Sequence, residues 1–121
     1  MSLIRQVVLE QIQGTISTKN STSSPIGGGS LFTGDWEEIT DCAIIKIAIT
    51  SNVASASDGF CIQQSTDQVE LWEDTYTLAA DSHKLYTINP VAKYFRIVYT
   101  NGVAAQSKFI IQTILSSVYT K

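Results

Sequence analysis

The side chains that could carry catalysis are few in this sequence. His83 is the single histidine, and it lies in the polar run of residues 81–84, which is typical of a solvated turn. A Ser-His-Asp triad needs its serine on a strained turn, and the G-x-S-x-G motif that marks one form of this turn does not occur here. We therefore expect no catalytic role for His83.

Carboxylates are the other candidates for chemistry, and they gather in two short clusters, residues 37–41 and residues 70–74. A glycosidase needs two carboxyl groups that face each other across a cleft. Nothing in the spacing places one cluster opposite the other, and acidic side chains in turns are usually solvated. The sequence therefore predicts that the protein is not an enzyme.

The sequence does not predict a binding site for a metal ion or a phosphate group. One histidine and two separated cysteines are poor material for the three or four ligands of a zinc site. No EF-hand loop is present, which leaves Asp58 and Asp67 as the alternative calcium ligands. The triple glycine at residues 27–29 lacks the lysine and the helix of a phosphate-binding loop and is interpreted as a flexible hinge. We expect no cofactor.

The two cysteines, Cys42 and Cys61, are interpreted as free, half-buried thiols that pack as small hydrophobic groups. The alternative is a disulfide between neighbouring strands. A chain of this length can bury enough surface to fold without such a link.

Composition and charge restrict the partners. The chain has 121 residues, enough for one domain, and its formal net charge is −3. Its eight Lys and Arg residues are scattered, so it has no basic stripe for nucleic acid. No apolar run approaches the ~20 residues of a membrane span, so we expect no membrane insertion. Arg5 and Glu10 interrupt the first apolar run, and no secretion signal is expected.

The main body of the chain reads as a series of short strands. Ile45, Ile47 and Ile49 alternate with other residues, as do the residues of 95–99, which is the period of a pleated strand. Turn-forming residues separate seven such segments: 31–40, 42–50, 59–65, 71–79, 84–88, 94–100 and 108–115. Their spacing predicts an all-β fold, an antiparallel jelly-roll-type β-sandwich of seven to eight strands with an extended N-terminal arm.

The N-terminal third differs in character. Residues 3–12 have a spacing that fits a helical face and a β-branched content that favours a strand, and we predict a strand. Residues 15–24 are almost wholly polar, with too few apolar side chains to offset the entropy of ordering. The predicted organisation is an N-terminal strand and flexible arm over residues 1–29 and a β-sandwich domain over residues 30–121.

The arm is predicted to mediate assembly. An extended segment can add a strand to an exposed sheet edge, where main-chain hydrogen bonds supply affinity. Six apolar side chains are expected to dock the arm onto the particle or onto a sister subunit: Leu3, Ile4, Val7, Val8, Leu9 and Ile12.

Aromatic side chains are the best candidates for surface contact with a sugar or a protein. Trp72 and Tyr86 are predicted to be partly exposed. Four other aromatic side chains are expected to pack in the core: Trp36, Phe95, Tyr99 and Phe109.

Four ordered segments resemble a module found in virion proteins of tailed phages. They are residues 33–39, 57–67, 92–102 and 105–113, and the resemblance covers most of residues 30–115. The pattern is also similar to discoidin-type carbohydrate-binding jelly rolls, in which an aromatic-Arg strand leads into the closing strands. Residues 68–72 are more apolar than the small polar residues usual in related modules, so Trp72 is expected to make a contact particular to this protein.

The resemblance implies a virion structural protein: a capsid decoration, head fibre or tail-associated protein that acts by protein–protein assembly. Its partners would be other virion proteins and further copies of itself, with a trimer expected by analogy with phage fibres. Its location would be the virion, assembled in the host cytoplasm. The alternative is a carbohydrate-binding module for attachment to a host-surface glycan.

Overall fold

The computed structural model describes residues 10–120, and this part of the chain contains nine β-strands and no helix. The strands are β1 (Glu10–Ile16), β2 (Leu31–Thr33), β3 (Glu37–Glu38), β4 (Ile44–Ser51), β5 (Ser55–Ser65), β6 (Leu71–Tyr76), β7 (Ser82–Ile88), β8 (Tyr94–Asn101) and β9 (Phe109–Thr120).

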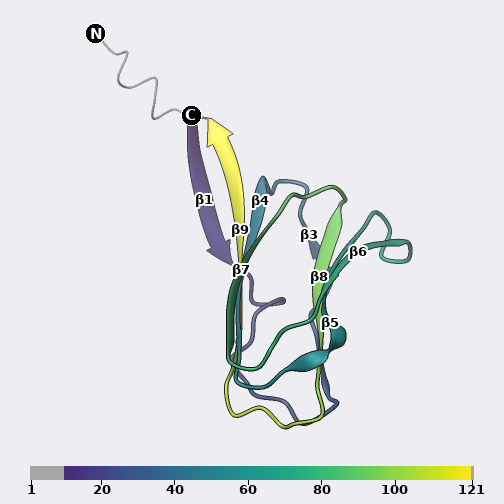
Figure 1. Ribbon diagram of the computed structural model, residues 1–121. Helices are drawn as coiled ribbons and strands as arrows, with labels where there is room; N and C mark the ends of the chain where they lie inside the picture. The colour runs from purple at the N-terminus through teal and green to yellow at the C-terminus, as the bar shows by residue number, and fades with distance from the viewer. Residues whose placement is uncertain (1–9, 121) are drawn as a thin grey trace.

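The strands form two antiparallel sheets that face each other (Figure 1). The four-stranded sheet has the order β1-β9-β4-β7. The five-stranded sheet has the order β2-β8-β5-β6, and β3 also pairs with β8. The predicted all-β antiparallel sandwich is confirmed. No helix of the described residues is long and apolar enough to cross a membrane.

The count of nine strands arises because the segment expected at residues 31–40 is interrupted. β2 and β3 both lie on the same edge of β8. Between them the N–H of Gly34 donates to the carbonyl of Ile97 at 2.8 Å, and the N–H of Asp35 donates to the carbonyl of Lys19 at 3.3 Å. The chain leaves the edge here to meet the residues that follow β1.

The core lies between the sheets and follows the alternation read from the sequence. Ile45, Ile47 and Ile49 of β4 face inward and are almost wholly buried. They belong to one cluster with Phe95, Ile97 and Tyr99 of β8. Each side chain of this size contributes about 1.5–3 kcal/mol when it is fully removed from water, so this central pair of strands dominates the stability of the sandwich.

Asn20 joins the two sheets through hydrogen bonds. Its Oδ1 accepts from the N–H of Ile97 in β8 at 2.8 Å, and its main-chain carbonyl accepts from Thr113 Oγ1 in β9 at 2.7 Å. Its Nδ2 donates to the carbonyl of Asp35 at 3.1 Å and to Glu37 Oε1 at 3.0 Å. The residue has no exposed surface, so one polar side chain fills the space between the sheet edges.

A flexible arm was expected over residues 1–29, and the part of it that follows β1 is held against the sandwich. Ser17 and Asn20 are buried, and Thr22 forms a β-bridge with Ile111. The glycines of residues 27–29 are also held, because Gly29 donates its N–H to the carbonyl of Gly102 at 2.8 Å. Hydrogen bonds between this segment and residues of both sheets keep it ordered. Apolar content alone does not reveal such hydrogen bonds.

We expect Asn20→Ala to lower the free energy of unfolding by about 3 kcal/mol, because it leaves the buried N–H of Ile97 without an acceptor and removes the donor to Asp35 and Glu37. Urea denaturation monitored by circular dichroism measures the change. Asn89→Ala is the matched control, since the Asn89 side chain is exposed, and a change within about 0.5 kcal/mol is expected there. A loss below 1 kcal/mol for Asn20→Ala would contradict this role.

We expect Gly34→Ala to destabilise the protein for a related reason. A Cβ at position 34 would overlap the Oδ1 of Asn20 and lie 3.0 Å from the carbonyl of Lys19. The variant must displace the buried amide, so its loss of stability in the same urea measurement should not add to that of Asn20→Ala in the double variant. Full additivity would show that the two positions act separately.

Candidate functional site

The residues considered for catalysis are separated or already engaged. His83 is exposed on β7, and its Nδ1 lies 3.1 Å from Thr50 Oγ1 on the neighbouring strand. Glu37 accepts a hydrogen bond from Ser17 Oγ at 2.6 Å in addition to the one from Asn20. Glu73 accepts from Gln63 Nε2 at 2.7 Å. These contacts hold strands and loops together and do not bring two carboxyl groups across a cleft.

Asp67, considered above as a calcium ligand, supports the hairpin turn between β5 and β6. Its Oδ1 accepts from the N–H groups of Val69 at 2.9 Å and Glu70 at 2.8 Å. These two donors favour the carboxylate and hold the pKa of Asp67 below its usual range. Gln68, with φ of 68°, occupies the left-handed position of the turn. Among the described residues no group of three or more potential ligands could hold a metal ion.

Both cysteines are free and half-buried. Cys42 Sγ donates to the carbonyl of Ile44 at 3.2 Å, and Cys61 Sγ donates to the carbonyl of Asp58 at 3.3 Å. Burial raises the pKa of each thiol, and the negative charge of Glu73 raises that of Cys61 further. The two side chains are therefore poor nucleophiles near neutral pH.

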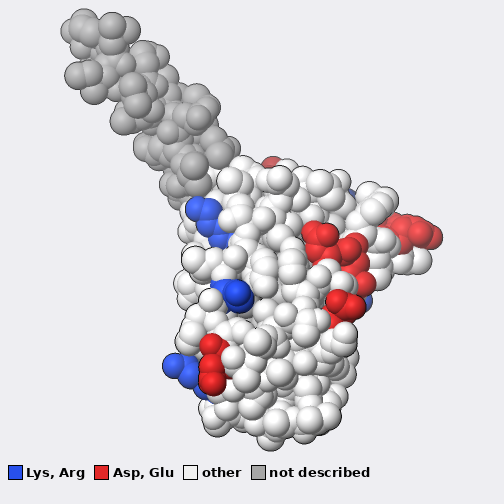
Figure 2. Space-filling model, viewed as in Figure 1, with Lys and Arg blue, Asp and Glu red and all other residues white. Residues whose placement is uncertain are grey.

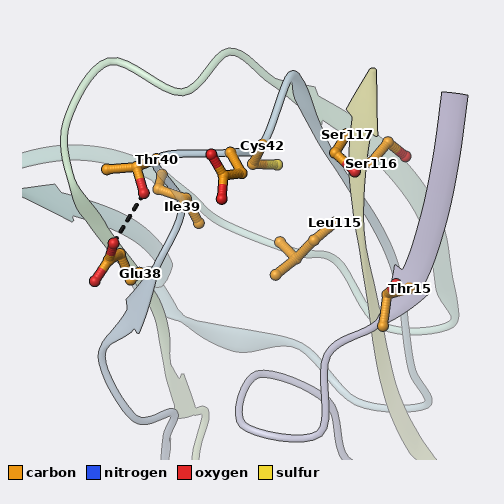
Figure 3. Close-up of a pocket in the computed structure, with 9 residues that line it drawn as sticks. Thr15, Glu38, Ile39, Thr40, Cys42, Leu115, Ser116 and Ser117 are labelled. Atoms are coloured by element: carbon orange, nitrogen blue, oxygen red, sulfur yellow. Dashed lines mark hydrogen bonds between the residues drawn. The ribbon is translucent and has the colours of Figure 1, made fainter. Parts of the chain in front are cut away.

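A small hollow of about 260 Å³ lies beside the end of β1 and the middle of β9, next to the segment that connects β3 to β4. Figure 3 shows Leu115 entering it from β9 and Ile39 from the connecting segment. Cys42 also lines the hollow, and the carboxylate of Glu38 at its rim accepts a hydrogen bond from Thr40 Oγ1 at 2.9 Å. Ile39 and Leu115 form an apolar patch among lining residues that are mostly polar, and this patch could contact one hydrophobic side chain.

β1 and the end of β9 continue beyond the rest of their sheet as a two-stranded ribbon. β1 pairs with β9 from Ile16 opposite Ile114 to Glu10 opposite Thr120, whereas the pairing of β4 with β9 reaches only Ser116. Residues 10–13 and 117–120 therefore pair with each other alone, and Figure 1 shows them rising past the other strands. Within the described range, the outer edge of β1 has no neighbouring strand.

The first nine residues of the predicted arm are joined to the domain through Glu10, at the tip of this ribbon. Ile12 lies in β1, opposite Val118. The other five residues of the predicted arm lie outside the described residues: Leu3, Ile4, Val7, Val8 and Leu9. Since β1 begins at Glu10, their covalent connection to the domain is at the far end of the ribbon.

The two aromatic side chains predicted to be partly exposed have different surroundings. Trp72 on β6 is 56% exposed. Tyr86 on β7 is half-buried, with its ring centroid 4.5 Å from that of Tyr76 and 5.3 Å from that of Phe60. Tyr86 therefore closes the side of the core, and Trp72 is the more accessible of the two.

Phe95, Tyr99 and Phe109 are buried in the core, as predicted. The prediction that Trp36 packs in the core is wrong. Trp36 is half-buried and lies against the guanidinium of Arg96, whose Cζ is 4.3 Å from the ring centroid. The positive charge of Arg96 over the indole face stabilises this outer position.

Several buried amides were missed by the sequence reasoning. Asn101 Nδ2 donates to the carbonyls of Gly27 at 3.0 Å and Ala104 at 2.8 Å. Gln106 receives the N–H of Ile26 at its Oε1 at 3.0 Å. The Asn-Gly pair predicted that Asn101 lies in a turn. Nothing in the composition predicted that the Asn101 and Gln106 side chains would form hydrogen bonds with the main chain of residues 26–27.

Charge is distributed unevenly over the two sheets. In Figure 2 acidic side chains gather on the side of the five-stranded sheet, and basic side chains lie mainly on the side of the four-stranded sheet. β3 and β6 carry acidic residues, and β4 and β7 carry Lys46 and Lys84. An anionic partner would therefore be repelled by the surface around β6.

Comparison with known proteins identifies a family and a shared fold. Residues 8–116 match the family described as the uncharacterised protein YqxG N-terminal domain. No curated protein matches the sequence significantly.

Several solved structures are similar, and two of them have TM-scores above 0.5. The PBSX exported protein XepA has a TM-score of 0.69 at 15% identity, covering 90% of this chain and 37% of that chain. The chain therefore spans little more than a third of the length of that protein. A structure of Bacillus endospore appendages, described as disulfide-linked pili, has a TM-score of 0.54 at 14% identity and covers 92% of this chain and 89% of that chain. At these identities the likeness is one of fold.

We expect both thiols to react slowly with iodoacetamide at pH 7.5, at least tenfold more slowly than in the urea-unfolded chain, because burial limits access and disfavours the thiolate. Since each folded pKa is raised, the rate should keep rising with pH through 9. Cys42→Ser and Cys61→Ser assign the rates by mass spectrometry. A fast reaction that reaches its plateau below pH 8 would contradict the raised pKa values.

Proposed function

The chain belongs to the family of the uncharacterised protein YqxG N-terminal domain. We propose that it is a structural module of a virion, which assembles through protein–protein contacts. The observation that carries the proposal is the ribbon of β1 and β9 with its unpaired outer edge. The finer proposals are a capsid decoration, a head fibre or a tail-associated protein.

The edge of β1 supports strand addition. An edge strand presents a row of main-chain N–H and C=O groups that another chain can pair with. β1 offers seven residues of such an edge, and residues 3–9 supply an apolar, β-branched segment that is attached at the ribbon tip. The arm of one copy would pair with a sheet edge of the next and place an apolar side chain in the hollow lined by Ile39 and Leu115.

The outer face of the four-stranded sheet offers further contact area. Leu85 of β7 is 85% exposed, and Ile16 of β1 and Ile110 of β9, which lie across β4 from it in the same sheet, are also exposed. Apolar side chains on one sheet face favour burial against another protein surface. Closed symmetry is the usual form of such contacts, and a homotrimer is the proposed oligomer.

The strand order supports a jelly-roll type of sandwich. The chain crosses from one sheet to the other between β4 and β5, and again at each step from β6 to β9. The β5–β6 connection stays within one sheet. β1 lies beside β9, and β2 and β3 lie beside β8, and this order supports the proposed likeness to capsid and lectin jelly rolls.

The similar structures agree in kind with this proposal, since one is an exported protein and the other belongs to appendage pili. The proposed location is therefore the virion or another particle outside the cell. Other virion proteins are the proposed partners, and assembly in the host cytoplasm is part of the same proposal.

Deleting residues 1–9 is expected to abolish self-association, because it removes the strand that would be added to a neighbouring sheet. Sedimentation velocity should show a mass near three times 13.2 kDa for the full chain and a single copy for the deletion. Replacing Leu3, Val7 and Leu9 by Ser should have the same effect, whereas replacing Ser2, Arg5 and Gln6 by Ala should not.

Circular dichroism must show the same β-spectrum for all these variants. A deletion variant that assembles as the full chain does would contradict the role of the arm. The virion assignment has a separate test, immunogold electron microscopy of particles from the source, where regular labelling is expected and unlabelled particles would contradict it.

A further inference from the structure

A groove of about 530 Å³ lies on the opposite lateral side of the sandwich from β1, between β6 and the loop after β7. Its two walls differ. β6 supplies Trp72, Asp74 and Tyr76, and the end of β7 and its loop supply Thr87, Asn89 and Val91. The size suits one or two sugar rings.

Trp72 and Asp74 face the inner side of their sheet and yet remain exposed. Trp72 lies opposite Gln64 and Asp74 lies opposite Ile62, and both of these β5 partners are buried. The four-stranded sheet ends at β7, so it leaves this stretch of β6 uncovered. The indole of Trp72 and the carboxylate of Asp74 therefore line an open groove, because no strand of the opposite sheet packs over them.

The loop wall is fixed before any ligand arrives. Gln64 Nε2 donates to the carbonyl of Asn89 at 3.0 Å, and its Oε1 accepts from the N–H of Val91 at 2.8 Å. The Gln64 side chain is itself buried, so both hydrogen bonds are shielded from water. A preformed wall reduces the ordering cost that a ligand must overcome.

We propose that this groove binds a neutral oligosaccharide. The apolar C–H face of a sugar ring would stack on the negative face of the Trp72 indole. Asp74, Thr87 and Asn89 offer carboxylate, hydroxyl and amide groups for the sugar hydroxyls. The groove is lined by Glu73 and Asp74 and by no Lys or Arg, so an anionic sugar is disfavoured.

Trp36 provides a matched control within the chain. The protein has two tryptophans, and Trp36 lies outside the groove, against Arg96. A Trp36→Phe background therefore leaves Trp72 as the only indole reporter. The groove also lies on the opposite lateral side from β1, so its test does not depend on the assembly proposal.

The experiment titrates the full chain with neutral tetrasaccharides of glucose, galactose, mannose, rhamnose and N-acetylglucosamine, and with tetragalacturonate as the anionic probe. Isothermal calorimetry and Trp72 fluorescence measure binding. We expect at least one neutral probe to bind with a Kd of about 0.1–1 mM, and tetragalacturonate to bind at least tenfold more weakly. Trp72→Ala should weaken binding at least tenfold, Asp74→Asn several-fold, and Trp36→Phe less than twofold.

The proposal would be overturned if no neutral probe bound with a Kd below 10 mM. It would also be overturned if the Trp72→Ala variant bound the neutral probe as tightly as the unmodified chain, or if tetragalacturonate bound more tightly than every neutral probe. Binding of the chain's own N-terminal segment in the groove would also overturn it. If a synthetic peptide of residues 1–12 binds in a Trp72-dependent manner and the sugars do not, the groove receives the arm of a neighbouring copy, and the assignment to a sugar is wrong.

Discussion

The side chain and carbonyl of Asn20 form the contact on which the described arrangement depends. They bond to β8 in one sheet and to β9 in the other, and they do so where Gly34 leaves no Cβ in the way. This contact fixes the segment that follows β1, and thereby the position of β1 on the edge of β9. Without it, only the peripheral hydrogen bonds of Ser17 to Glu37 and of Asp35 to Lys19 would tie this segment to the second sheet.

The two proposed interaction sites use opposite lateral sides of one scaffold. β1 lies at one end of the four-stranded sheet, and β7 lies at the other, next to the groove beside β6. Assembly through β1 would leave the groove accessible on the particle surface. The uneven charge of Figure 2 is consistent with this division, because the acidic residues gather on the sheet that carries the groove.

The alternation of Ile45, Ile47 and Ile49 predicted the core and hence the sandwich, because a strand with one buried face must repeat every second residue. The polar segment around Asn20 was misjudged, since its order comes from hydrogen bonds to residues 77 and 93 positions away. The outer position of Trp36, between β2 and β3, likewise depends on Arg96, a residue of β8 that is distant in the sequence. Such partners follow from register, which no local pattern specifies. Trp72 was identified from its apolar surroundings in the sequence, but its groove depends on where the opposite sheet ends.

Hydrogen exchange on the assembled particle tests the central claim, that the arm adds a strand to a neighbouring sheet, most directly. The account predicts that the amides of residues 3–9 exchange more slowly in the assembly than in the isolated chain, together with the amides of one edge strand. Fast exchange of residues 3–9 in the assembled particle would contradict strand addition by the arm.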